Sequence, residues 1–71
     1  MKTKYPHIFF SLIAEQNCWG ITLGGETANL PSGLDCKEIA ESKKTKRTLV
    51  NVEYRGQNWY AWIDNAEIDF E

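Results

Sequence analysis

The densest group of chemically useful side chains is the aromatic run WYAWI near the C-terminus, which contains Trp59, Tyr60 and Trp62. Alternate side chains of an extended strand point to opposite faces. Trp59 therefore shares a face with Ala61 and Ile63. Tyr60 and Trp62 point the other way, and they lie outside if the first face is the core. Exposed Trp and Tyr side chains typically anchor protein interfaces. Burial of both aromatic faces in a very small sheet is the alternative interpretation.

Acidic residues follow the aromatic run at Asp64, Glu67, Asp69 and Glu71. They form a negative end beside Trp62 that suits a basic partner, because complementary charge speeds and orients association. The alternative is a solubilising tail, and their spacing does not match the oxygen-rich pattern of a calcium loop. The sequence thus predicts a partner-binding set composed of Trp59, Tyr60, Trp62, Asp64, Glu67 and Asp69.

A basic run lies in the middle of the chain, with candidate nucleic-acid-binding residues Lys43, Lys44, Lys46 and Arg47. Such a run can hold a phosphate backbone while neighbouring aromatic side chains stack on bases. The chain as a whole has 8 basic and 10 acidic residues and a net charge of −2, which opposes binding dominated by phosphate contacts. A solvated loop is the other interpretation of this run.

The sequence offers little for catalysis or metal binding. His7 is the single histidine, and no serine or cysteine stands at a spacing that supports a nucleophile–base pair. Cys18 and Cys36 form no CxxC pair, and we expect two reduced thiols rather than one bridge. We therefore predict no catalytic residues, no metal and no cofactor. An enzyme whose site forms only in an oligomer is a less favoured hypothesis.

The length of 71 residues predicts a single domain over residues 1–71. An apolar fraction of 42% is typical of a globular protein, and no run of about 18 apolar residues exists, which excludes a membrane span. The short apolar stretch 8–14 is followed by Glu15 rather than by a small-residue cleavage site. We expect a cytoplasmic protein, either a monomer or a homodimer.

The first half of the chain predicts two strands and one short helix. Strand-forming residues occupy 5–14 and 18–23, and Gly24-Gly25 reads as a turn that ends the second strand. A loop is expected over 26–33. Cys36, Ile39 and Ala40 then fall on one stripe at helical spacing, which predicts a helix near 35–42; an irregular loop is the alternative.

The last third predicts a hairpin and a closing strand. Apolar and polar residues alternate from Thr48 to Tyr54, a turn is expected over 55–58, and 59–63 forms the return strand. A tight turn, of 3₁₀ type, is expected at 64–66 before a short strand over 67–70. Such a chain avoids open edges best by curling up, so the predicted fold is mainly β, a small five-stranded barrel with one short helix.

Residues 50–70, VNVEYRGQNWYAWIDNAEIDF, resemble the end of SH3-like barrels, especially of bacterial SH3 domains. Those domains often end with a strand, a glycine-containing hairpin turn, an aromatic–apolar pair, a 3₁₀ turn and a short last strand. The resemblance places the turn at 55–57 and the pair at Trp62-Ile63. It implies an SH3-like barrel. The acidic ALYDY-type start is missing, so the resemblance does not imply binding of proline-rich peptides.

The sequence as a whole predicts a small non-enzymatic protein-interaction module. It would act as an inhibitor or accessory factor that binds a host protein through exposed aromatic and acidic C-terminal residues. The alternative is a nucleic-acid-binding module that uses the basic run 43–47 and its aromatic neighbours.

Overall fold

The computed structural model describes residues 2–3, 9–17 and 20–69, and most of them lie in strands. The elements are β1 (Lys2–Thr3), β2 (Phe9–Asn17), β3 (Gly20–Asn29), β4 (Lys37–Ser42), β5 (Arg47–Tyr54), β6 (Gln57–Asp64), the 3₁₀ turn η1 (Asn65–Glu67) and β7 (Ile68–Asp69). The predicted mainly β class is confirmed. No helix in the described part of the chain is long and apolar enough to cross a membrane.

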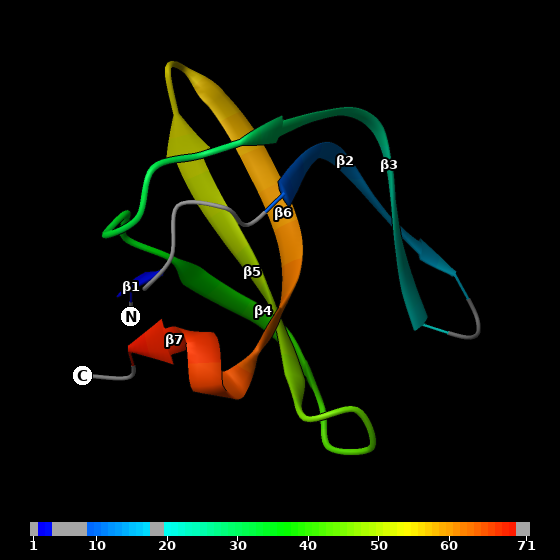
Figure 1. The fold of residues 1–71 in the computed structure, drawn as a ribbon. Helices are drawn as coiled ribbons and strands as arrows, with labels where there is room; N and C mark the ends of the chain where they lie inside the picture. The colour runs from blue at the N-terminus through cyan, green and yellow to red at the C-terminus, as the bar shows by residue number, and fades with distance from the viewer. Residues whose placement is uncertain (1, 4–8, 18–19, 70–71) are drawn as a thin grey trace.

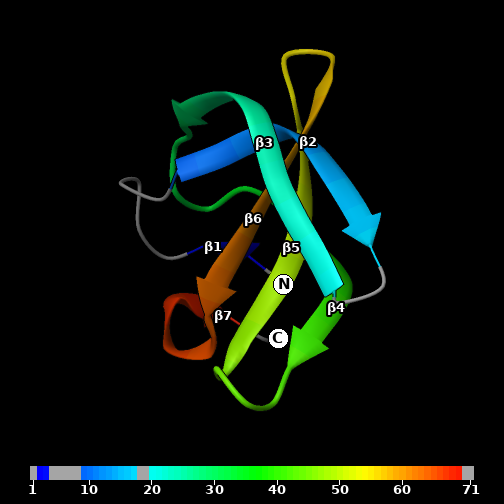
Figure 2. The ribbon, with the colours of Figure 1, turned by 90° about the vertical axis from the view of Figure 1, so that its right-hand side faces the viewer.

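Five strands form one antiparallel sheet in the order β3-β2-β6-β5-β4, and β1 pairs with β7 in a separate two-stranded sheet. The sheet is strongly twisted, and the β2–β3 hairpin swings away from the plane of the other three strands (Figure 1). Seen from the side, β3 crosses in front of β5 (Figure 2). The hairpin therefore stands over one face of the β4–β5–β6 meander.

The β5–β6 hairpin is the most regular part of the fold. Its register runs without a break from Arg47 opposite Asp64 to Tyr54 opposite Gln57. Arg55 and Gly56 join the strands with φ angles of +51° and +76°. Positive φ at both central residues is the signature of a type I′ turn, whose twist matches that of the strands it connects. The predicted turn is confirmed, although Gln57 and Asn58 already belong to β6.

The core lies on one face of this hairpin. Val50 faces Ala61 and Val52 faces Trp59, and all four side chains are buried. Among the described residues, the buried apolar cluster consists of Phe10, Leu30, Val50, Val52, Trp59, Ala61, Ile63 and Ile68. The sequence left open which face of residues 59–63 is the core, and the structure places Trp59, Ala61 and Ile63 in it.

The predicted helix near 35–42 is wrong, because this segment forms β4 on the edge of β5. Pairing with β5 satisfies backbone groups that an isolated short helix would leave to water. The helical pattern arises from a bulge. The register passes from Glu38 opposite Val50 to Ala40 opposite Leu49, which leaves Ile39 as an extra residue that is 45% exposed.

This bulge changes the face on which the following side chains lie. Cys36 packs against the core cluster, whereas Ala40 lies opposite Leu49 on the other face of the sheet. Two apolar residues four positions apart therefore serve opposite faces of a strand. The same spacing is what suggested one stripe of a helix.

The predicted turn at Gly24-Gly25 is also wrong, because β3 continues through both glycines. The register jumps from Ser11 opposite Thr27 to Ile13 opposite Gly24, so β3 carries a bulge at this point. Gly25 has a φ of +81°, and a Cβ there would lie 3.1 Å from Cδ1 of Ile13. This bulge requires a residue that adopts the left-handed backbone conformation and carries no side chain, which is glycine.

The other element boundaries in this part of the chain also differ from the expected ones. The loop expected over 26–33 begins at Leu30, after β3 has ended at Asn29. The strand expected over 5–14 corresponds to β2, which begins at Phe9 and extends to Asn17, beyond the expected end at 14. Residues 5–8 of the expected first strand, and 18–19 of the second, lie outside the described residues.

The two ends of the chain close the core. β1 pairs with β7 through Thr3 opposite Ile68, and the amide of Gly33 donates a hydrogen bond of 2.8 Å to the carbonyl of Thr3. The expected 3₁₀ turn is present as η1 directly after β6, and the expected closing strand is β7. The positions of η1 and β7 were therefore predicted well from the sequence.

The left-handed turn generates a test of the fold. Gly56→Ala should lower the free energy of unfolding by about 1 kcal/mol, because a side chain at positive φ is strained even where space is open. Gly24→Ala is the matched control: no atom lies within 4 Å of a Cβ there and its φ is not positive, so we expect no loss. Urea denaturation of both variants makes the measurement. Equal losses would contradict the turn assignment.

Candidate functional site

An open groove of about 580 Å³ lies between the β2–β3 hairpin and the β4–β5–β6 meander. The hairpin contributes one wall, and residues of β4, β5, β6 and the β4–β5 turn form the rest. The lining residues are Gln16, Ile21, Ala40, Glu41, Ser42, Thr45, Arg47 and Trp62. The groove brings together segments that are far apart in the sequence.

Trp62 is the aromatic residue of this groove. It is half-buried and lies opposite Leu49, which is completely buried on the same face of the sheet. Its indole Nε1 donates a hydrogen bond of 3.3 Å to the carbonyl oxygen of Ile21. This bond ties the hairpin to the meander and holds the indole ring in one orientation.

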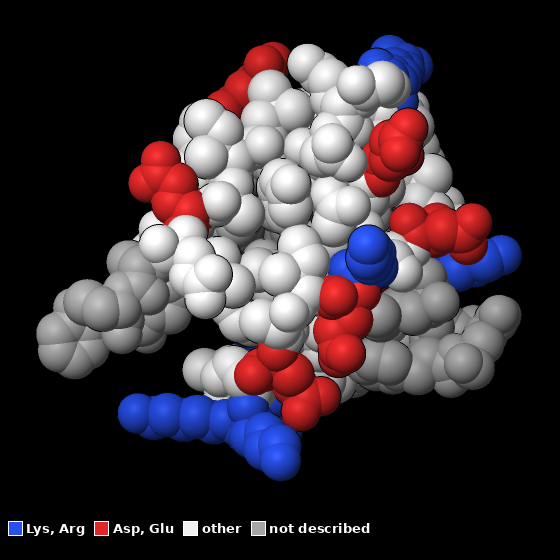
Figure 3. All heavy atoms as spheres, turned by 180° about the vertical axis from the view of Figure 1, so that it is seen from behind, with Lys and Arg blue, Asp and Glu red and all other residues white. Residues whose placement is uncertain are grey.

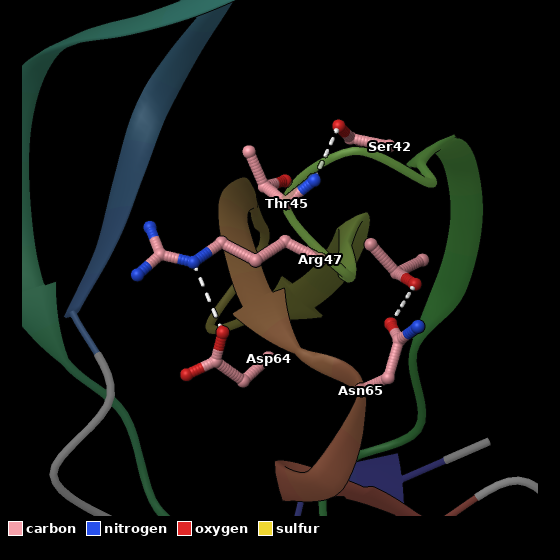
Figure 4. A network of polar contacts seen from close by, with 6 residues as sticks. Ser42, Thr45, Arg47, Asp64 and Asn65 are labelled. Carbon is pink, nitrogen blue, oxygen red and sulfur yellow. Dashed lines mark hydrogen bonds and ion pairs between the residues drawn. The ribbon is translucent and has the colours of Figure 1, made fainter.

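Arg47 enters the groove from the start of β5. It lies directly opposite Asp64 in the β5–β6 register, and its Nε donates to Oδ1 of Asp64 at 3.0 Å. Both side chains are about half exposed, at 53%. The terminal nitrogens of the guanidinium point away from Asp64 toward the β2–β3 hairpin (Figure 4). Asp64 thus orients Arg47, and among the described residues no acceptor engages the terminal nitrogens of its guanidinium.

The β4–β5 turn, residues 43–46, is held by backbone contacts at both ends. The amide of Thr45 donates to Oγ of Ser42 at 3.3 Å, and the carbonyl of Lys46 accepts from the amide of Asn65 at 3.0 Å. Lys46 has a φ of +56°, which bends the chain into β5. The turn is therefore fixed in the backbone while its lysine side chains are exposed.

Basic side chains extend from the lower end of the molecule, where this turn lies, and acidic side chains lie directly above them (Figure 3). The turn and the groove belong to one region of the surface, because Ser42, Thr45 and Arg47 line the groove.

A second hydrogen bond anchors the same region to the core face. The hydroxyl of Thr48, which is completely buried, donates to Oδ1 of Asn65 at 2.6 Å. Asn65 thus contacts both the turn, through its backbone amide, and β5, through its side chain (Figure 4). The start of η1 holds the strand from which Arg47 projects.

The structure separates the three predicted aromatic residues. Trp59 is 6% exposed and packs in the core, so its ring is not offered to a partner. Tyr60 is half-buried on the same face as Trp62, opposite Ser11 and Asn51, and does not line the groove. Trp62 alone lines it.

The predicted acidic residues are likewise spread out. Asp64 stands at the groove through its contact with Arg47, and Glu67 is half-buried in η1. Asp69 pairs in β7 through its backbone, and its side chain lies outside the described residues. Of the two carboxylates whose side chains the structure describes, Asp64 alone contacts a residue of the groove.

The predicted basic residues fall in two places. Lys43, Lys44 and Lys46 are exposed on the β4–β5 turn, whereas Arg47 lies in the groove. Sequence reasoning missed the walls, namely Gln16 and Ile21 of the hairpin and Ala40, Ser42 and Thr45 on the opposite side. No local signal marks them, because the groove depends on a contact between residues 41 positions apart.

Cys36 is a free, half-buried thiol, and its Sγ lies 3.4 Å from the carbonyl oxygen of Leu34. Burial raises the pKa of this thiol above its ordinary value, because a thiolate would lose hydration. Cys18 and His7 lie outside the described residues, as does Trp19. Among the residues that the structure does describe, no three His, Cys, Asp or Glu side chains gather as metal ligands would.

No family model, curated protein or solved structure matches this chain in comparisons with known proteins.

Removal of the Asn65 side chain tests the anchor of the groove. Asn65→Ala leaves the buried hydroxyl of Thr48 without its acceptor and should lower the free energy of unfolding by about 1–2 kcal/mol. Asn58→Ala, at an exposed asparagine of β6, is the matched control and should change it by less than about 0.5 kcal/mol. Urea denaturation measures both. Equal effects would contradict the anchoring role.

The raised pKa of Cys36 predicts slow alkylation. At mildly alkaline pH, iodoacetamide should modify Cys36 several-fold more slowly in the folded protein than in the urea-unfolded chain, because the thiolate is the nucleophile. Mass spectrometry of peptides distinguishes Cys36 from Cys18. Because the folded-state pKa is the higher one, ionisation of this thiol at high pH should also lower the free energy of unfolding. Equal alkylation rates in both states would refute this assignment.

Proposed function

We propose that this chain is an SH3-like barrel and a non-enzymatic protein-interaction module. It acts as an inhibitor or accessory factor that holds an extended segment of a partner protein in the groove beside Trp62. The proposal keeps the partner-binding role of the aromatic C-terminal strand and moves its centre to one residue of that strand.

The SH3-like part of this proposal is supported by the order of elements in the second half of the chain. A three-stranded meander, β4–β5–β6, ends in a 3₁₀ turn and a short last strand that pairs with β1. The long β2–β3 hairpin folds over one face of the meander, and the closing strands cover the other (Figure 1). Sheets that curl in this way leave few open edges.

The observation that carries the binding role is the position of Trp62. Its indole nitrogen is occupied by Ile21, so the ring is already oriented, while the ring itself lines an open groove between two hairpins. A preorganised aromatic side chain loses little conformational entropy when a partner binds. Tryptophan is also among the residues that contribute most to binding energy at protein interfaces.

The composition of the groove supports binding rather than catalysis. Among the described residues that line it there is no histidine and no cysteine, and the Ser42 hydroxyl accepts a hydrogen bond from a backbone amide. A nucleophile needs a general base within hydrogen-bonding reach. The groove instead combines one aromatic surface, one oriented guanidinium and several neutral polar groups.

The nucleic-acid alternative rests on a specific observation, the basic β4–β5 turn at the rim of the same groove. Asp64 engages one edge of Arg47, and Glu41 lines the groove, so two carboxylates stand where a phosphate backbone would pass. A partner protein therefore fits this surface better. Capture of the binding partner from nuclease-treated lysate distinguishes a protein from a nucleic acid.

Replacement of Trp62 tests the proposed function. Trp62→Ala should weaken binding of a partner captured from nuclease-treated source-cell lysate by at least about 30-fold in isothermal titration calorimetry. Trp62→Phe, which still covers Leu49, guards against a loss caused by unfolding and should show a smaller loss of affinity. Circular dichroism checks the fold of each variant.

Ile13→Ala is the control, because Ile13 is 48% exposed and lies outside the groove. It should bind as the unmodified protein does. Unchanged affinity in a folded Trp62→Ala variant would rule out the groove as the binding site. Capture that disappears on nuclease treatment would favour the nucleic-acid alternative.

A further inference from the structure

We propose that the groove selects an acidic segment of its partner. In this proposal an aspartate or glutamate of an extended segment pairs with the outer edge of the Arg47 guanidinium, and a neighbouring apolar side chain lies on Trp62. The inference rests on the proposed function, because it names the chemistry of the segment that the groove accepts.

The geometry of Arg47 is the first support. Its Nε donates to Asp64 at 3.0 Å, whereas the two terminal nitrogens point away from Asp64, toward the hairpin that forms one wall of the groove (Figure 4). A guanidinium offers two parallel donors on such an edge, which match the two oxygens of a carboxylate. The N–H groups on the terminal nitrogens of Arg47 therefore suit a carboxylate better than a single neutral acceptor.

The orientation of this guanidinium is built into the hairpin. Arg47 and Asp64 are direct cross-strand neighbours in the unbroken β5–β6 register, and the backbone next to Arg47 is held by Asn65. An ion pair as exposed as this one contributes little to stability. We infer that Asp64 acts chiefly by positioning Arg47, so that less side-chain freedom is lost when a ligand carboxylate binds.

The charge around the groove is the second support. The described lining of the groove carries one cation, Arg47, and one carboxylate, Glu41. The neighbouring β4–β5 turn adds three exposed lysines, Lys43, Lys44 and Lys46, in a chain whose net charge is −2. This patch attracts an acidic segment and orients its approach.

A peptide suits this site better than a nucleic acid. A protein segment can present one carboxylate to Arg47 and neutral backbone to Glu41, whereas a nucleic acid brings a phosphate at each nucleotide. The volume of about 580 Å³ also lies in the range of sites that enclose a few side chains. The groove thus fits a short extended stretch with one acidic and one apolar contact.

Selection from a phage library of random linear peptides tests this proposal. The unmodified protein should enrich peptides in which Asp or Glu lies next to a large apolar residue. A synthetic peptide of the most enriched sequence should bind Arg47→Gln at least about tenfold more weakly in isothermal titration calorimetry. Changing its acidic residue to the amide should cause a similar loss on the unmodified protein and little further loss on Arg47→Gln.

Arg55→Gln is the matched control. Arg55 lies in the β5–β6 turn over the Tyr54 ring, away from the groove lining, so this variant should bind the peptide as the unmodified protein does. Arg47→Glu provides a further test, because a reversed charge should no longer select acidic peptides. Circular dichroism confirms that each variant is folded.

Three outcomes would overturn the proposal. Enriched peptides without an acidic position, whose binding still requires Trp62, would leave the proposed function standing and refute the acidic preference. Absence of any Trp62-dependent enrichment would refute both. Binding of single-stranded DNA oligonucleotides that depends on Arg47 and falls steeply with salt, without peptide enrichment, would assign the site to nucleic acid.

Discussion

The rest of the structure depends on the register of the β5–β6 hairpin. Because side chains alternate along a strand, a slip of one residue would move every core side chain of a strand to the opposite face. The two-residue turn at Arg55-Gly56 excludes such a slip, since both residues adopt the left-handed conformation that this turn type needs. The same register places Val52 against Trp59 in the core and Arg47 against Asp64 at the groove.

The C-terminal third was predictable because its signals are local. Alternation from Thr48 to Tyr54, a glycine in the turn and polar residues before η1 each act over a few neighbouring residues. The part of the chain before β5 depends on two bulges, at Gly25 and at Ile39, and a bulge changes the face of all later side chains of its strand. Patterns read along the chain therefore suggested a helix and a turn where the structure has continuous strands.

Only part of the candidate site could be predicted from the sequence. Alternation placed Trp62 and Tyr60 on one face of the strand, but it could neither tell whether that face was the core nor choose between the two residues. That choice follows from the β2–β3 hairpin, whose Ile21 carbonyl meets the Trp62 indole across 41 positions of sequence. The basic run and the acid at position 64 looked like two separate features, whereas the hairpin register makes Arg47 and Asp64 one oriented pair.

A single surface therefore combines an oriented indole, an oriented guanidinium and a basic turn whose backbone is held by hydrogen bonds. The most direct test of this binding site is an amide and indole chemical-shift map of the isotope-labelled protein as its captured partner is added. We expect the largest shifts to fall on the Trp62 indole, on Ile21 and on residues 42–47. Shifts confined to the opposite end of the hairpin, around Tyr54 and Gln57, would contradict it.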